Sequence, residues 1–270
     1  MAEYCKTSGV VLRIAEYSES SQIVTLWTKE FGKLQGIAKG ARRRKGGGGA
    51  GMDLLNLCEI VFVKKPSPAL NIITSWQVAD DFSGLRSDLG RLYAAMYAAE
   101  FVSSATDEDD AEPGIFRLLV SFLRALAAGA SSYPALLRFE LLLLEAIGLG
   151  PHVDTCVVCG RPLDKSARAD KAARFSPAAG GALCRNCAHG HGDAIAVSHD
   201  ALSAMSLLSV RSRFAGSSQL NLSGGTALQV RLLLDKHIVY HLGRPLEMRK
   251  HVNPQGAPVP LGGTAAGMET

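Results

Sequence analysis

The sequence predicts an α+β multidomain protein, and three features of its 270 residues carry this prediction. Short segments rich in Val, Ile, Leu and Thr fill the first 80 residues, with Gly, Ser and Pro between them. From about residue 85, apolar residues recur every three or four positions, as they do in helices. Two Cys-x2-Cys pairs interrupt this helical part. The expected order is therefore a strand-built domain followed by a helical domain that carries a cysteine-rich insertion.

The first domain is predicted to be a small β-barrel. Five strand-like segments follow one another within about 70 residues, and no helical pattern between them is long enough for a parallel crossover. An N-terminal OB-fold β-barrel has this number of strands and this size. A five-stranded SH3-like barrel fits nearly as well, so the strand pattern leaves both open. The predicted strands are 9–14, 22–28, 33–38, 56–63 and 70–78.

The second domain is predicted to be all-α. Pro113 and Pro134 stand where helices begin, and Gly148 stands where a left-handed residue would end one. The helix that contains Phe139 is apolar on most sides, so we expect it to be central. Residues 106–112 form an acidic stretch, expected to be a solvated loop. The predicted helices are 87–104, 113–129, 134–148, 199–211 and 226–241.

These patterns set the expected domain limits. The barrel occupies residues 1–80, and the helical domain occupies 81–252 with the cysteine-rich insertion at 152–192. Residues 253–270 are rich in Gly, Pro and Ala without periodicity, which predicts a disordered tail.

Charge is distributed unevenly over these parts, although the formal net charge is only +4. Residues 1–79 hold eleven cationic and six acidic side chains, whereas residues 80–150 hold five and eleven. The insertion and the C-terminal part are mildly basic. A basic N-terminal segment followed by an acidic central segment indicates that the two segments have different partners.

The four cysteines of the insertion are predicted to bind one structural zinc ion. They are Cys156, Cys159, Cys184 and Cys187, with 24 residues between the two pairs. Paired Cys-x2-Cys knuckles at such a separation suit a tetrahedral thiolate site. Residues 175–183 between them have the composition of a short hairpin, the usual body of a zinc ribbon. The alternatives are unmetallated cysteine pairs or a site that the fold no longer needs.

Four thiolate ligands leave no coordination position for water, so catalysis at this ion is not expected. His189 and His191 follow the second knuckle and could compete as ligands, although we expect them to face solvent. Cys5 and Cys58 lie in strand-like segments and are expected to be small apolar residues.

A cationic segment in the barrel predicts contacts with phosphates. Five cations lie within residues 39–45, just before the glycine-rich stretch 46–51. A cluster of this density on a barrel loop suits electrostatic binding to nucleic acid without sequence readout. The candidate DNA contacts are Arg13, Lys33, Lys39, Arg42, Arg43, Arg44 and Lys45, with Lys64 and Lys65 on nearby strands. Tyr17, Trp27 and Phe31 could stack on bases, but barrel core is an equally good interpretation of Trp27 and Phe31.

The sequence contains no pattern of an enzyme. The glycines at 46, 48 and 51 match G-x-G-x-x-G only because they lie in a glycine run without a surrounding βαβ unit. A P-loop, an H-E-x-x-H pair, a G-x-S-x-G elbow and the zinc-deaminase pattern are all missing from the sequence.

The N-terminus lacks a secretion signal and no apolar run reaches 18 residues, so a cytoplasmic protein without membrane contact is expected.

Several separated motifs, in order, carry a resemblance to a known family. In the barrel they are Gly9-Val10-Val11-Leu12-Arg13, Tyr17-Ser18-Glu19-Ser20, Ile23 to Thr28, Phe31-Gly32-Lys33-Leu34 and Ala38 to Arg43. Further along they are Leu137-Arg138-Phe139-Glu140-Leu141, Cys156 to Pro162, Phe175-Ser176-Pro177 and His241 to Leu246. In these motifs the chain resembles the bacterial DNA repair and recombination mediators of the RecO family, over about residues 8–250.

The resemblance implies an N-terminal OB-fold, a helical domain and an inserted four-cysteine zinc ribbon. It also implies a non-enzymatic role in the RecF pathway: binding single- and double-stranded DNA, annealing complementary strands, and helping RecA to replace the single-strand-binding protein. RecR is the implied protein partner, and the implied location is cytoplasmic and nucleoid-associated. Lys39, Arg42 and Arg43 carry over as DNA contacts, and Arg138 as a contact for the acidic tail of the single-strand-binding protein or as an intramolecular ion pair.

The chain departs from the family in one place. Where the family continues the basic loop into a charged and aromatic stretch, this chain has Gly46–Gly51, which leaves the loop's DNA contacts open. Another function class also remains, a zinc-ribbon protein-interaction adaptor without direct DNA activity.

Overall fold

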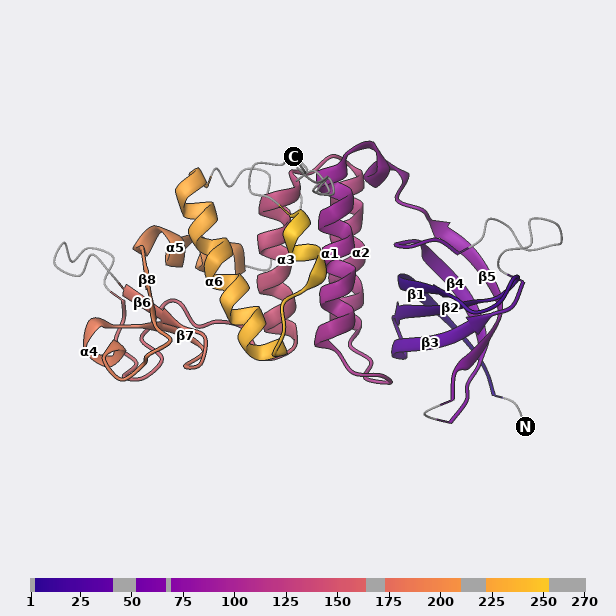
Figure 1. The fold of residues 1–270 in the computed structure, drawn as a ribbon, viewed down its shortest axis with the longest axis horizontal. Coiled ribbons are helices and arrows are strands. Elements are labelled where there is room, and N and C mark those ends of the chain that lie inside the picture. The colour runs from indigo at the N-terminus through magenta and orange to yellow at the C-terminus, as the bar shows by residue number, and fades with distance from the viewer. Residues whose placement is uncertain (1–2, 41–51, 67–68, 164–172, 210–221, 253–270) are drawn as a thin grey trace, which may run out of the picture.

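The protein is an elongated molecule of three parts (Figure 1), seen in a computed structural model. A β-barrel occupies one end, helices occupy the middle, and the cysteine-bearing part occupies the other end. The structure describes residues 3–40, 52–66, 69–163, 173–209 and 222–252.

The N-terminal part is a closed five-stranded barrel with the strand order β1-β2-β3-β5-β4. β1 pairs with both β2 and β4 in antiparallel fashion, whereas β3 and β5 are parallel. This connectivity is that of an OB-fold, which confirms the OB-fold prediction over the SH3-like alternative. The strands are β1 (Tyr4–Glu16), β2 (Gln22–Thr28), β3 (Gly32–Ala38), β4 (Leu57–Val63) and β5 (Asn71–Asp80).

β1 begins five residues before the predicted strand. Its first half pairs with β4, with Tyr4 opposite Val63 and Ser8 opposite Glu59. The Ser8 hydroxyl donates to Glu59 Oε1 at 2.5 Å. This half of the strand was not predicted, because it contains polar residues such as Lys6 and Thr7. It forms a strand through pairing with a segment about 50 residues away, which local composition does not show.

Two separate apolar clusters lie on the two faces of the barrel strands. The barrel interior contains side chains such as Val24, Leu26 and Phe62. Val10 and Trp27, on the outer face of β1 and β2, belong instead to the large core that continues into the helices. The barrel is therefore joined to the helical part through a shared apolar core.

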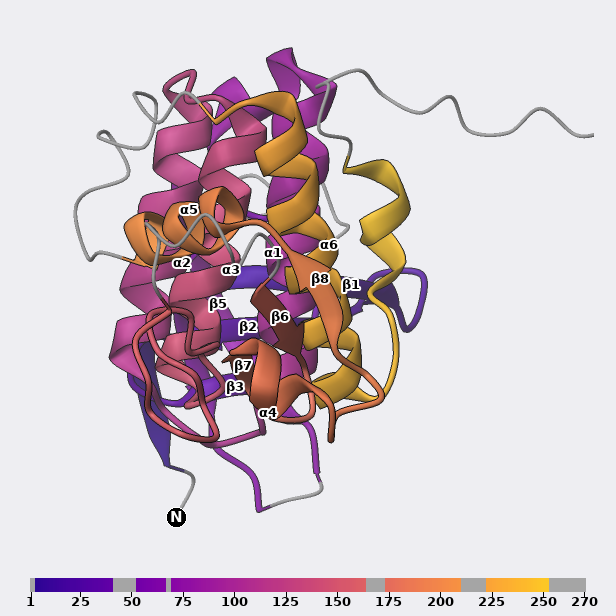
Figure 2. The same cartoon turned by 90° about the vertical axis from the view of Figure 1, so that its left-hand side faces the viewer.

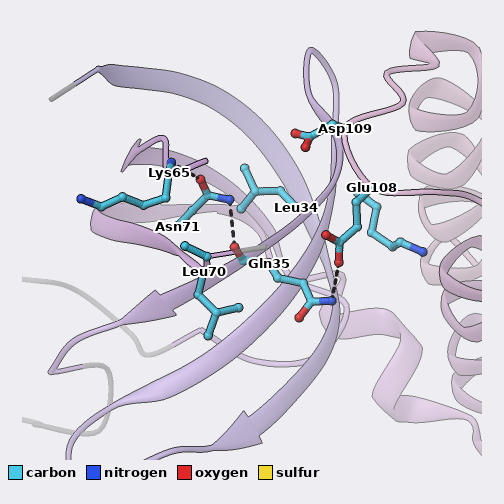
Figure 3. A pocket seen from close by; sticks show the side chains of 9 residues that line it. Leu34, Gln35, Lys65, Leu70, Asn71, Glu108 and Asp109 are labelled. Atoms are coloured by element: carbon cyan, nitrogen blue, oxygen red, sulfur yellow. Dashed lines mark hydrogen bonds between the residues drawn. The ribbon is translucent and has the colours of Figure 1, made fainter. Parts of the chain in front are cut away.

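Polar contacts fix the same junction. Lys33 Nζ donates to the carbonyl oxygen of Ser103 at 2.9 Å and also to that of Thr106, at the C-terminal end of a helix. Gln35 Nε2 donates to Glu108 Oε1 at 2.7 Å (Figure 3). Gly32 has φ 62°, and a Cβ there would lie 2.2 Å from the Asp110 carbonyl oxygen. The acidic stretch 106–112 thus contacts β3 through Glu108 and its backbone, while residues 107–112 stay exposed, as expected for a solvated loop.

The middle part is built on three long helices, α1, α2 and α3, that pack against one another. α3 is central, as predicted, since its side chains from Leu136 to Leu141 are all buried. It begins at Ser132, because Pro134 is tolerated in a first turn whose N–H groups have no partner within the helix. Gly148 has φ 76° and follows its end, as expected for a left-handed cap. The helices are η1 (Ser83–Ser87), α1 (Leu89–Ala105), α2 (Pro113–Ala127), α3 (Ser132–Ala146), α5 (His199–Ser209), α6 (Gly224–Leu242) and η3 (Glu247–His251).

A buried ionic network links α3, α6 and η3. Arg231 Nη1 lies 2.5 Å from Glu140 Oε1, and Arg231 Nη2 lies 3.0 Å from Asp235 Oδ1. Arg249 Nη2 pairs with the other Asp235 oxygen at 2.8 Å. The Arg231 guanidinium also lies over the Tyr97 ring at 5.0 Å. Glu140 raises the pKa of Arg231 against the opposing effect of burial, so this arginine stays charged in the core.

The far end of the molecule is a small ribbon. It contains β6 (Ala173–Ser176), β7 (Gly181–Leu183), β8 (Ile195–Val197) and the short helix α4 (Arg185–Ala188). β6 and β7 form the predicted hairpin, and β8 adds a third strand beyond residue 192. Figure 2 shows these elements in front of the helices, seen from this end.

The ribbon is packed firmly on the helices. Phe175, Ala182 and Val197 belong to the same apolar core as the helical domain. Asp193 braces the hairpin, because it accepts hydrogen bonds from the Ser176 hydroxyl at 2.7 Å and from the Ala178 N–H at 3.0 Å. In the part of the chain that the structure describes, no helix is long and apolar enough to cross a membrane.

His237 lies at the junction of α6, the ribbon and the end of α3. Its Nε2 is 2.8 Å from the Leu149 carbonyl oxygen, its ring centroid is 5.8 Å from that of Phe175, and it is 1% exposed. Burial lowers the pKa of His237 from 6.5 to about 4. The neutral ring therefore donates its Nε2 proton to Leu149, and protonation is costly in the folded state.

Acid should therefore destabilise the folded protein between pH 6.5 and pH 4. The depressed pKa means that the unfolded chain binds more protons in this range, so stability is full above pH 6.5 and falls as pH falls. The expected loss through His237 is about 3 kcal/mol at pH 4. His237→Gln keeps a donor for Leu149 and should flatten the dependence of urea-unfolding free energy on pH by about one proton. Lys236→Gln, at an exposed position of the same helix, is the control, and equal pH slopes for the two variants would refute the assignment.

Candidate metal centre and nucleic-acid interface

The two knuckles are shaped by backbone hydrogen bonds. In the first, the Gly160 N–H donates to the Cys156 carbonyl at 2.8 Å, and Gly160 has φ 70°, which a residue with a side chain rarely adopts. The Cys156 N–H donates to the Arg161 carbonyl at 2.8 Å, which closes the loop. In the second, Cys184 precedes α4, and the Ala188 N–H donates to its carbonyl at 3.0 Å.

The four predicted ligands come together. The sulfur atoms of Cys156, Cys159, Cys184 and Cys187 all lie within 4.8 Å of one another, with 3.9 Å between Cys159 Sγ and Cys184 Sγ. Cys156 is buried and Cys159 is exposed, so the group lies at the edge of the ribbon. His189 is exposed, and neither it nor His191 joins the group. This arrangement can hold one metal ion.

The environment of the sulfurs favours a thiolate at one position. Burial alone would raise the pKa of the Cys156 thiol, but backbone N–H groups of Cys184, Cys159 and Val158 lower its pKa to about 6. The pKa of Cys187 is raised to about 12, first by its hydrogen bond with the Cys184 thiol. A metal ion would therefore bind Cys156 as an existing thiolate, and its binding would release the proton of the Cys187 thiol.

The cations proposed as DNA contacts fall into three groups. Arg13, on β1, and Lys39, just after the end of β3, are exposed. Lys33 caps the end of α1 and faces the domain junction, so we leave it out of the proposed DNA surface. The remaining four, Arg42, Arg43, Arg44 and Lys45, lie outside the described residues.

Arg138 is 1% exposed on the central helix α3. Burial lowers the pKa of its guanidinium, the effect expected where water is excluded. An acidic peptide could reach this side chain only after the groups that cover it moved aside.

The aromatic side chains of the barrel are mostly engaged in packing. Trp27 is 1% exposed and belongs to the core shared with the helices, so core packing is the correct interpretation and base stacking by Trp27 is ruled out in this arrangement. Phe31 packs edge-on against Phe62 with ring centroids 5.2 Å apart, and Lys64 lies over its ring. Tyr17 is 62% exposed and remains available for stacking.

The junction between β3 and the acidic stretch encloses a small cavity of about 50 Å³ (Figure 3). Lys65, Asn71 and Glu108 are among its polar lining residues. Its volume is comparable to one or two water molecules, so it is too small for a substrate. A wider groove of about 530 Å³ runs along α6 and η3, with Leu228 and Leu232 on one wall and Val252 on the other.

Sequence comparison adds a family relationship to this geometry. A family model described as "Recombination protein O N terminal" matches residues 1–82, and one described as "Recombination protein O C terminal" matches residues 86–250. The chain is 34% identical over 251 residues to a DNA repair protein RecO of Anaeromyxobacter sp. (strain K), covering 93% of this chain and 96% of that protein. It is 36% identical over 197 residues to a DNA repair protein RecO of Rhodopirellula baltica, covering 73% and 72% of the two chains.

Proposed function

The chain belongs to the recombination protein O family of DNA repair proteins, and on this premise we propose that it is a non-enzymatic mediator of repair and recombination that binds DNA and anneals complementary strands. The observation that carries the proposal is the cationic segment 39–45, which directly follows β3 of an OB-fold barrel. Single- and double-stranded DNA share the phosphate backbone that such a segment binds, so both are proposed as ligands.

Annealing follows physically from charge neutralisation. Two complementary strands repel each other through their phosphates, and each Lys or Arg that pairs with a phosphate reduces this repulsion. The exposed Arg13 on β1 and Lys39 just after β3 add two cations on the barrel, and Tyr17 supplies an exposed aromatic ring. Because the outer face around Trp27 is covered by helices, we place the DNA on a part of the barrel that the helices leave uncovered.

The proposed protein partners are RecR and the single-strand-binding protein, in the loading of RecA onto coated single strands. Arg138 stays the proposed contact for an acidic tail, with the condition that its covering groups move. The proposed place of action is the nucleoid.

The metal is proposed to be one structural zinc ion per chain. A tetrahedral site with Zn–S distances of about 2.3 Å separates its sulfurs by about 3.8 Å, close to the 3.9 Å between Cys159 Sγ and Cys184 Sγ. When bound, the ion would cross-link the two knuckles and hold the hairpin between them. All four ligand positions belong to the protein, so its role is in folding rather than chemistry.

The test of DNA binding is the variant Arg42→Ala/Arg43→Ala/Arg44→Ala. Its affinity for single-stranded DNA is expected to fall about tenfold near 100 mM salt, for all sequences alike. The slope of log affinity against log salt should become shallower by about 2, because three phosphate contacts are lost. Fluorescence anisotropy over a salt series measures both quantities.

Three exposed cations of the helical part, Arg117, Lys236 and Lys250, provide a matched control when changed together to alanine. This control should bind DNA as the parent does. Retention of a protein partner by a chain that binds no DNA at any salt concentration would favour the adaptor function instead.

A further inference from the structure

Three arginines of the ribbon lie close to its four cysteines in sequence or in strand register. Arg161 follows the first knuckle directly, Arg185 lies inside the second, and Arg174 lies on β6. All three are exposed. The sequence itself places Arg161 and Arg185 at the two knuckles, and the fold adds Arg174 from β6.

Strand register places Arg174 on the metal-bearing face. Arg174 is the cross-strand partner of Leu183, and directly opposed residues of an antiparallel pair project to the same face. Leu183 packs with Cys156 in the ribbon's own small core, whereas Phe175 on the other face packs with the helices. Beside the centre, Val158 at the tip of the first knuckle is 55% exposed. The outward face of the ribbon therefore combines cations with an exposed apolar side chain.

Among the described residues, no carboxylate neutralises these cations. None of the three arginines has an ion-pair partner among the described residues, and Arg174 donates only to the Ala194 carbonyl, at 3.2 Å. Asp193 is occupied by Ser176 and the hairpin backbone, and its pKa is lowered by those hydrogen bonds despite burial. Residues 152–192 hold six cationic and three acidic side chains. Asp193 and β8 also belong to the ribbon, and residues 152–197 hold six cationic and four acidic side chains. Four thiolates and a divalent ion would add a net −2 and bring the ribbon to neutrality, so the exposed positions of the three arginines, and not net charge, favour the binding of an anion.

We propose that Arg161, Arg174 and Arg185 form a second phosphate-binding surface, which contacts a second segment of nucleic acid while the barrel holds the first. Guanidinium groups suit this role, because they bind phosphate in a bidentate manner. The proposal rests on DNA binding by the barrel, and it adds a second contact at the opposite end of the molecule (Figure 1). The acidic helical part, with five cationic and eleven acidic side chains in residues 80–150, separates the two surfaces.

The two surfaces would make one molecule bivalent for nucleic acid. A second strand held by the ribbon stays near the strand on the barrel, which raises its effective concentration. The ribbon surface should thus matter more for annealing than for the affinity of one short strand.

The test is the full-length variant Arg161→Gln/Arg174→Gln/Arg185→Gln. Annealing of complementary strands is expected to slow at least about fivefold, while affinity for a short single strand changes less than about twofold. Protein saturated with one unlabelled short strand should bind a second, labelled strand, and the variant should lose this second binding. Arg→Lys at the same three positions keeps the charge but loses the bidentate geometry, so its annealing rate should lie between those of the parent and the Gln variant.

The metal content of the variant distinguishes phosphate binding by the arginines from a role of the arginines in supporting the metal centre. The Gln variant is expected to keep one metal ion per chain. Unchanged annealing with the metal retained would overturn the proposal, and so would loss of annealing together with the metal, because the arginines would then serve the metal centre. Failure of the parent protein to bind DNA through residues 42–44 would instead refute the proposed function, and second-strand binding by the ribbon can still be measured in that case.

Discussion

Replacing Cys156 and Cys184 together with serine is expected to abolish metal binding and to unfold the ribbon. Each knuckle then keeps a single thiolate, too few to hold the ion. Structural zinc contributes about 10–16 kcal/mol in small zinc-binding peptides at neutral pH, so a ribbon of this size should depend on it. Among the described residues, the knuckle side of the ribbon buries only Cys156, Leu183 and Ala188 in a core of its own, so it has little else to replace that contribution. Phe175, Ala182 and Val197 hold the opposite face of the ribbon on the helices.

Zinc stoichiometry and protease sensitivity measure this outcome. The parent should contain one zinc per chain and the variant none, and cleavage should appear within the ribbon. Cys5→Ser, at a cysteine on β1 far from the ribbon, is the matched control and should keep both properties. A variant that still holds one zinc would show that the four cysteines are not the ligand set. A variant without zinc that resists protease as the parent does would show that the ribbon folds without the metal.

Replacing Arg231 with methionine is expected to destabilise the protein by about 3–5 kcal/mol. Glu140 is completely buried, and Arg231 is its ion-pair partner at 2.5 Å. Without the guanidinium, a buried carboxylate loses its counter-charge, and Asp235 loses one of its two arginines. Burial is the largest influence on Glu140 and already raises its pKa. In the absence of Arg231 the carboxyl group would therefore become protonated, or the surrounding core would unfold.

The double change Glu140→Gln/Arg231→Met should cost less than Arg231→Met alone, because no charge is then left unpaired in the core. Lys236→Met on the same helix is the control, since Lys236 is exposed and should change the free energy of unfolding by less than about 0.5 kcal/mol. Urea unfolding of the three variants gives the comparison. Equal stability of Arg231→Met and Lys236→Met would contradict the ionic network.

Local sequence signals were sufficient for much of this fold. Proline and glycine at helix ends placed α2 and the end of α3, because those residues act through their own backbone preferences. The cysteine spacing identified all four candidate ligands, since a knuckle is formed within a few residues. The β2 strand was predicted with its observed limits, Gln22 and Thr28.

Features that depend on contacts between domains could not be predicted in this way. Trp27 lies on a strand whose two faces are both buried, one by the barrel interior and one by the helices, so alternation could not assign it. The charge of Lys33 suggested a phosphate contact, but its ammonium group donates to a backbone carbonyl at the C-terminal end of α1. Arg161 and Arg185 lie at the knuckles in the sequence, but Arg174 reaches the same face only through the pairing of β6 with β7.

The rate at which complementary strands anneal, when both are coated with single-strand-binding protein, tests the central proposal most directly. The parent protein should accelerate annealing above the protein-free rate, and added salt should reduce the acceleration steeply. Arg42→Ala/Arg43→Ala/Arg44→Ala should lose most of the acceleration, while the control with Arg117, Lys236 and Lys250 changed to alanine should keep it. A parent that leaves the annealing rate unchanged, or a loop variant that anneals as fast as the parent, would contradict DNA mediation through the cationic barrel loop.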